Sequence, residues 1–233
     1  LNIISSWIKS YSSGNYFKAQ TTLKRNGDLS APKYILSNSG NNENNISLTF
    51  GKNKILSQWK TNFSYFSQEI GILRSSHIGN VSDLVYAIEL AKPGIIQPFD
   101  HRISFPKQLN SHYTTRIQYS KRNKSNGKLN TKYSWQRNNR KEYDVRRGKL
   151  KNKPAIDITL NTHDLLANYQ WEKLNWSLDS GVFFQIQDNY SDPDTGTRRL
   201  IPDYLKTKLG TYFTASLTPS NNFSLAFGFR YSH

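Results

Sequence analysis

The chain has 233 residues, of which 36% are hydrophobic, and it carries a formal net charge of +16 and no cysteine. The absence of cysteine excludes a disulfide framework and a thiolate metal site, and the lack of any run of roughly 20 apolar residues excludes a membrane-spanning helix. A mean hydropathy of −0.71 is still compatible with a β-barrel wall, because only alternate residues of each strand then meet lipid.

Alternation of apolar and polar residues predicts ten strands, since successive side chains of an extended chain point to opposite faces. The first strand has the weakest pattern, because Ile3, Ile4 and Trp7 do not alternate cleanly. The last has the clearest, with a large apolar residue at every odd position from Phe223 to Tyr231. The strands are expected at 3–12, 16–25, 45–52, 55–72, 107–122, 128–144, 155–172, 175–190, 204–217 and 223–233.

The seventh strand changes parity along its length. Ile156 and Leu160 share one face, whereas Leu165 and Tyr169 share the other. One extra residue in a strand reverses which residues face a given side. The sequence therefore predicts a β-bulge near 162–164.

Connections between the predicted strands alternate between short and long. Gly- and Asn-rich turns occur near 13–15, 52–54, 123–127, 173–174 and 219–222, and long polar connections at 26–44, 73–106, 145–154 and 191–203. Short turns at one end and long loops at the other are typical of outer-membrane barrels. The strands at 55–72 and 128–144 exceed the 9–11 or so residues that cross the hydrocarbon, so the wall is expected to project above the membrane.

The connection 73–106 contains one predicted helix. Asn80 can cap it, Asp83 suits its first turn, and Lys92, Pro93 and Gly94 end it. Such a helix either packs over the barrel mouth or compacts a long loop.

These patterns together predict an all-β fold, the wall of an antiparallel up-and-down transmembrane β-barrel. The residues that are expected to face lipid are large, share one strand parity and lie opposite polar neighbours. They are Leu129, Tyr133, Trp135, Trp176, Leu178, Phe184, Phe213, Leu225 and Phe227.

Four stretches of the chain resemble TonB-dependent outer-membrane receptors of Gram-negative bacteria. The resemblance implies a barrel of about 22 strands with a plugged lumen, of which this chain supplies about ten. The 233 residues contain no methionine, signal peptide, plug or TonB-contact segment, so residues 1–233 are expected to be an internal part of one barrel domain. The stretches are Glu69–Leu84, Arg140–Gly148, Pro154–His163 and Gly196–Tyr204.

The resemblance also implies a function and a set of partners. Such a receptor binds a scarce nutrient at its extracellular face, for example a ferric siderophore, and imports it when the TonB complex acts on the plug. The implied location is the cell outer membrane of a Gram-negative bacterium. The implied partners are the TonB complex, outer-membrane lipid and lipopolysaccharide, a small-molecule or metal-chelate substrate, and a surface lipoprotein.

Paired arginines are candidate ligand-binding residues. Arg146 with Arg147, and Arg198 with Arg199, lie at the tops of neighbouring connections, and guanidinium groups bind carboxylate and phosphate in a bidentate manner. The alternative is that they pair with carboxylates of the wall and hold the loops in place. The acidic residues available for that pairing are Asp144, Glu142 and Asp203.

Metal binding has less support in the sequence. His77 and His101 lie in one long loop, but no regular ligand spacing accompanies them, and His77 is kept only as a candidate ligand-binding residue. The stretch Asp192–Gly196 resembles the beginning of a calcium loop but lacks the third carboxylate and the distant Glu, which favours a tight turn. We therefore expect no metal and no cofactor.

The sequence also bears on four other classes of function. No catalytic motif is present, so an enzyme is not expected. The cations are dispersed and no helix carries a basic stripe, which argues against nucleic acid. A passive porin shares every periodic feature, and a soluble basic all-β binding protein would instead enclose Trp135 and Trp176 in a core.

Overall fold

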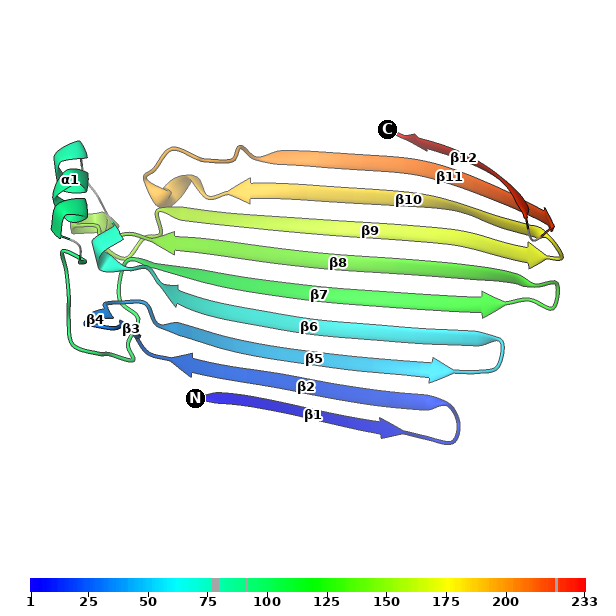
Figure 1. The fold of residues 1–233 in the computed structure, drawn as a ribbon, viewed down its shortest axis with the longest axis horizontal. Helices are drawn as coiled ribbons and strands as arrows, with labels where there is room; N and C mark the ends of the chain where they lie inside the picture. Colours follow the sequence, from blue (N-terminus) through cyan, green and yellow to red (C-terminus); the bar gives the residue numbers. More distant parts are fainter. Residues whose placement is uncertain (77–79, 91, 221) are drawn as a thin grey trace.

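The structure, a computed structural model, describes residues 1–76, 80–90, 92–220 and 222–233. One antiparallel sheet of ten strands dominates it, in the order β1-β2-β5-β6-β7-β8-β9-β10-β11-β12. Figure 1 shows a single curved layer in which the long connections gather at one end and the tight turns at the other. The strands are β1 Asn2–Ser10, β2 Asn15–Asn26, β5 Asn41–Asn53, β6 Ser57–Gly71, β7 Lys107–Arg122, β8 Gly127–Tyr143, β9 Ile156–Lys173, β10 Trp176–Ser191, β11 Tyr204–Ser220 and β12 Phe223–Ser232.

All ten predicted strands are present, and the predicted up-and-down order is confirmed. The structure adds two short strands that were not predicted, β3 (Leu29–Ala31) and β4 (Tyr34–Leu36), which pair with each other inside the first long connection. Three residues are too few to show a two-residue period. Three short 3₁₀ helices lie in the other long connections: η1 (Arg74–Ser76), η2 (Gly148–Leu150) and η3 (Pro193–Thr195).

The predicted helix is confirmed as α1, Val81–Leu90. Asn80 caps it, because its side-chain oxygen accepts a hydrogen bond from the backbone N–H of Asp83 at 2.9 Å. The helix lies at the loop end (Figure 1), and none of its residues is buried. Among the described helices, none is long and apolar enough to cross a membrane.

The strand register divides the sheet into an apolar face and a polar face. One row of paired residues crosses eight strands from β2 to β11, and its members are apolar apart from one threonine. It lies on the face predicted to meet lipid, here called the apolar face. The row is Phe17, Phe50, Thr61, Ile117, Tyr133, Leu165, Phe184 and Leu209.

The next row along the strands, displaced by one residue, lies on the opposite face. It is charged or hydrogen-bonding at every position, so a single step along each strand exchanges one kind of surface for the other. We call this side the polar face. The row is Lys18, Thr49, Asn62, Arg116, Ser134, Asp164, Gln185 and Lys208.

No second layer covers the apolar face. Among the described residues, no hydrophobic residue is buried, and Trp176 and Phe227 are 47% and 64% exposed. Trp135 is only half-buried and lies on the same open face. The soluble alternative predicted that Trp135 and Trp176 would be enclosed in a core, and that prediction does not hold.

The predicted β-bulge near 162–164 is wrong. The β9–β10 register is continuous there, with Thr162, His163 and Asp164 opposite Gln187, Ile186 and Gln185. The apolar residues of β9 change faces because different groups cover the sheet at the two ends of this strand. Ile156 and Ile158 lie on the polar face, where residues 192–203 fold back over them.

Two hydrogen bonds from side chains of β10 to backbone carbonyls hold residues 192–203 against the sheet. The Asn189 amide donates to the Pro202 carbonyl at 3.0 Å, and the Ser191 hydroxyl donates to the Ile201 carbonyl at 2.8 Å. Both donors are on the polar face and are buried. The apolar residues of β9 therefore lie on the polar face where residues 192–203 cover that face, and on the apolar face along the rest of the strand.

The two faces generate a prediction for neighbouring residues of β10. Phe184→Arg should destabilise the full-length protein in lipid vesicles by about 2–4 kcal/mol, because the arginine would lie in hydrocarbon. Gln185→Arg, one residue away, should be nearly neutral, since Asp164 accepts a hydrogen bond from Gln185 at 2.7 Å and can pair with the new charge. Urea unfolding in vesicles measures both, and equal losses would contradict the assignment of the faces.

Candidate functional site

Two long connections at the loop end form one body, here called the double loop (144–155 and 192–203). The Arg146 guanidinium donates to the Thr195 carbonyl at 2.5 Å and to the Pro154 carbonyl at 3.5 Å. The Thr197 hydroxyl donates to the Ala155 carbonyl in the opposite direction. Since backbone groups of both loops are used, the two connections hold one another in place.

The local fold of the second loop follows from its sequence. The Asp192 carboxylate accepts from the Asp194 backbone N–H at 2.8 Å and so caps η3. Gly196, at φ 70°, ends the turn in a conformation that favours glycine. The stretch that resembles a calcium loop is therefore a capped tight turn, and no group of three or more metal-ligating side chains occurs among the described residues.

The four predicted arginines have different environments. Arg146 is half-buried and bonded to backbone carbonyls, as described above. Arg199 pairs with Asp203 at 3.0 Å, and Asp203 also accepts from the Ser191 backbone N–H at 2.7 Å. Arg147 and Arg198 are exposed on the double loop.

The exposed part of the double loop is cationic. Lys149 and Lys151 lie near Arg147 in the chain and are also exposed. Two nearby acidic residues are already engaged, because Glu142 pairs with Arg140 and Asp144 accepts from the Val145 backbone N–H at 2.6 Å. Asp194 is an exposed carboxylate of the double loop, and the exposed cations outnumber it. The double loop therefore presents guanidinium and ammonium groups to the solvent.

Of the two loop histidines, the structure describes His101. His77 lies outside the described residues. His101 packs edge-on against Phe99, with ring centroids 4.9 Å apart. Neighbouring Asp100 accepts from the Arg102 backbone N–H at 3.0 Å, and this hydrogen bond lowers the pKa of the Asp100 carboxyl.

Asn38 joins the other two long connections, and sequence reasoning did not single it out. Its amide donates to the Ile72 and Pro106 carbonyls at 2.8 and 2.7 Å, and its carbonyl oxygen accepts from the Ser104 N–H at 2.8 Å. Asn38 is 6% exposed and has a φ of 66°, a conformation that asparagine tolerates better than most residues. The Ser-Asn-Ser-Gly sequence at 37–40 was the only signal of a turn.

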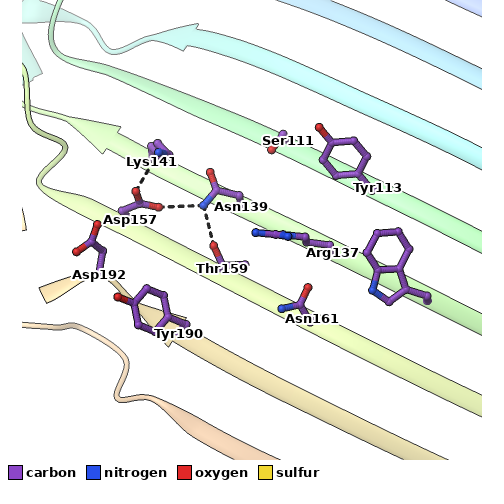
Figure 2. Close-up of a pocket in the computed structure, with 11 residues that line it drawn as sticks. Ser111, Tyr113, Arg137, Asn139, Lys141, Asp157, Thr159, Asn161, Tyr190 and Asp192 are labelled. Carbon is purple, nitrogen blue, oxygen red and sulfur yellow. Dashed lines mark hydrogen bonds and ion pairs between the residues drawn. The ribbon is translucent and has the colours of Figure 1, made fainter.

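A hollow of about 690 Å³, lined mainly by polar side chains, lies near the loop end of β7 to β10. It is on the same side of the sheet as the apolar row, but closer to the long connections. We call it the wall hollow (Figure 2). Lys141 pairs with Asp157 at 3.0 Å, and the Asn139 amide donates to Asp157 and to the Thr159 hydroxyl, both at 2.9 Å. Sequence reasoning missed this site because its residues come from four strands and only the register brings them together.

The sheet and its loop end are similar to two solved structures. The ferric-catecholate import receptor Fiu from E. coli K12, in its open form, superimposes with a TM-score of 0.65 at 10% identity, over 99% of this chain and 43% of that one. The ferric citrate transporter FecA in its unliganded form gives a TM-score of 0.56 at 11% identity, over 98% of this chain and 34% of that one. The fold is that of a TonB-dependent receptor barrel.

The likeness confirms the predicted fold class, an all-β wall of about ten strands from an antiparallel up-and-down β-barrel. At 10% and 11% identity it establishes the fold alone. The chain spans less than half the length of either structure. No protein-family model matches the chain, and no curated protein sequence does.

Asn38 gives a prediction about the loop end of this barrel wall. Asn38→Gly keeps the backbone conformation but removes three hydrogen bonds, each of which contributes about 0.5–1.5 kcal/mol. Limited proteolysis of residues 92–106 in the full-length protein should therefore become at least about tenfold faster. Asn126→Gly is the control, because Asn126 has a similar φ of 61° in a hairpin turn. Identical cleavage of the two variants would show that Asn38 does not hold the loops.

Proposed function

We propose that the protein is an outer-membrane receptor that binds an anionic metal chelate at its loop end and imports it by TonB-coupled transport. The observation that carries the proposal is the sheet itself: one exposed apolar face, one polar face, and long connections at one end only. An apolar face of this extent is stable when hydrocarbon lies against it. The fold likeness to a receptor and a transporter of ferric chelates supports the same reading and favours a non-catalytic role.

The direction of the wall follows from its two ends. Outer-membrane barrels have short turns on the periplasmic side and long loops outside the cell. By this rule the double loop, α1 and the Asn38 junction face the medium, and the hairpin turns face the periplasm. The proposed location is the outer membrane of a Gram-negative bacterium.

The double loop fits an anionic ligand. Ferric complexes of catecholates and of citrate carry negative charge, and exposed guanidinium groups bind such oxygens through charge-assisted hydrogen bonds. Arg147, Arg198 and Arg199 are exposed on the double loop, but Arg199 is paired with Asp203, so we assign the contact with the ligand to Arg147 and Arg198. Arg146 and Arg199 are assigned to holding the loops, because both already have partners.

Transport requires parts that this chain does not include. The chain covers 43% and 34% of the two similar structures, and we propose that residues 1–233 are part of one barrel domain. A plug domain and the remaining strands would complete it, and the plug would contact the TonB complex. Lipopolysaccharide and a surface lipoprotein are the other proposed partners.

The ligand assignment can be tested by charge reversal. Arg147→Glu combined with Arg198→Glu should weaken the binding of ferric catecholate or ferric citrate to the purified full-length protein by at least about tenfold, since two charge-assisted contacts are replaced by repulsion. The matched control is Lys54→Glu with Lys124→Glu, exposed cations in turns at the opposite end of the sheet. Fluorescence titration gives both affinities, and equal affinities would refute the assignment.

Transport itself needs a cellular assay. Uptake of the labelled ferric chelate by cells that carry the full-length gene should stop when the TonB complex is inactivated. A passive porin, the alternative that shares the two-faced wall, would continue to admit its solutes. Uptake that does not depend on TonB would therefore contradict the proposed function and support the passive porin.

A further inference from the structure

Four lysines recur at corresponding positions in four neighbouring hairpins of the sheet. Each lies at or next to the end of the first strand of its hairpin, on the apolar face. Each is directly opposite a large apolar residue of the second strand. We call these four residues the turn-end lysines. The pairs are Lys9 with Phe17, Lys52 with Trp59, Lys121 with Leu129 and Lys173 with Trp176.

No carboxylate neutralises the turn-end lysines on their own face. Between the apolar row that contains Phe17 and the hairpin turns, the acidic strand residues are Glu172 and Asp179, and both have the parity of the polar face. At the loop end the apolar face carries both signs, and Asp157 pairs there with Lys141. Within the part of the chain that the structure describes, no ion pair reaches a turn-end lysine. The turn end of the apolar face is therefore purely cationic.

The tilt of barrel strands places the turn-end lysines at one depth. Strands of a closed barrel tilt by about 35–45°, so a level plane shifts by about 1.0–1.4 residues per strand at ordinary strand spacing and rise. Lys9 is level with the apolar row, and the other three lie two, four and eight residues beyond it, on strands two, four and six places from β1. These shifts are about 1.0 to 1.3 residues per strand. Figure 1 shows the hairpin turns displaced in the same direction from β1–β2 to β7–β8.

That common depth is the lower boundary of the hydrocarbon. Trp59 and Trp176 lie opposite two of the turn-end lysines, and such rings are favoured where hydrocarbon meets water. Three turn-end lysines are exposed and Lys52 is half-buried. A lysine stem lies along apolar surface while its ammonium group extends to the polar layer. Since short turns face the periplasm, this polar layer consists of the phospholipid headgroups of the periplasmic leaflet.

We propose that the turn-end lysines bind the phosphates of anionic phospholipids in the periplasmic leaflet, in preference to zwitterionic ones. A phosphatidylglycerol headgroup offers a phosphate with no cation of its own, whereas an ethanolamine headgroup already carries an ammonium group. Neighbouring turn-end lysines are two strands, or about 10 Å, apart across the sheet, so each meets a separate headgroup. The occupant is a lipid because the apolar face continues directly from these lysines. The inference rests on the proposed function in one respect, since it requires the apolar face to meet the outer membrane.

The preference can be measured on the unaltered full-length protein in detergent, with bound lipid counted by native mass spectrometry. Phosphatidylglycerol should bind at least about tenfold more tightly than phosphatidylethanolamine with the same acyl chains, because each lysine near an anionic surface strengthens binding by about fivefold. Equal affinities for the two lipids would overturn the proposal without any variant.

Replacement of all four turn-end lysines by glutamine should abolish this preference. The matched control removes the same charge from the polar face of the same half of the sheet, and it should keep the preference. An equal loss in the two variants, or a preference that survives in the first, would overturn the assignment. The control is Lys18→Gln, Lys60→Gln, Lys128→Gln and Lys132→Gln.

Two further measurements identify the source of the phosphate and the cause of a failure. Glycerol phosphate, the headgroup without acyl chains, should not compete with phosphatidylglycerol at equal concentration, and equal competition would show a phosphate site that needs no lipid. Titration with the ferric chelate separates the two proposals. Normal chelate binding without a lipid preference would overturn this inference alone, whereas a lipid preference without chelate binding would overturn the ligand assignment alone.

Discussion

The structure depends on one constraint. Because no second layer of protein packs against the single sheet, each of its two faces is covered by molecules that surround the chain. Adjacent rows of the register differ by one residue, yet one carries Phe17, Phe50 and Phe184 and the next carries Lys18, Asn62 and Gln185. A slip of one residue in any strand would exchange the two environments for that whole strand. The alternation therefore fixes the register as firmly as a packed core fixes a globular fold.

The same constraint explains how much the sequence could predict. The ten strands were predictable because lipid and water impose a two-residue period over many residues. The bulge was predicted wrongly because that inference assumed one environment along all of β9, whereas the double loop covers its upper end at Ile156 and Ile158. Asn38 and the wall hollow were missed for another reason: their contacts join residues distant in the chain, and no local pattern encodes such partners.

The loop end is organised in pairs. Asn38 joins the connection after β2 to the connection after β6, and Arg146 joins the connection after β8 to the connection after β10. In each pair side chains of one segment bond to backbone groups of the other, so these contacts do not depend on the partner's side chains. The exposed cations are then free to vary in identity without loosening the loops that present them.

The hydrogen bond from Arg146 to Thr195 bears on the conformational entropy that the double loop would lose when a ligand binds. Arg146 fastens residues 144–155 to Thr195, so under the proposed function a ligand on Arg198 would also restrain the segment that carries Arg147. The two arginines would consequently approach a ligand in concert, and the conformational freedom lost on capture is lost by one unit instead of two. Selectivity for ligands whose negative groups match that fixed spacing is the outcome expected of such stiffness.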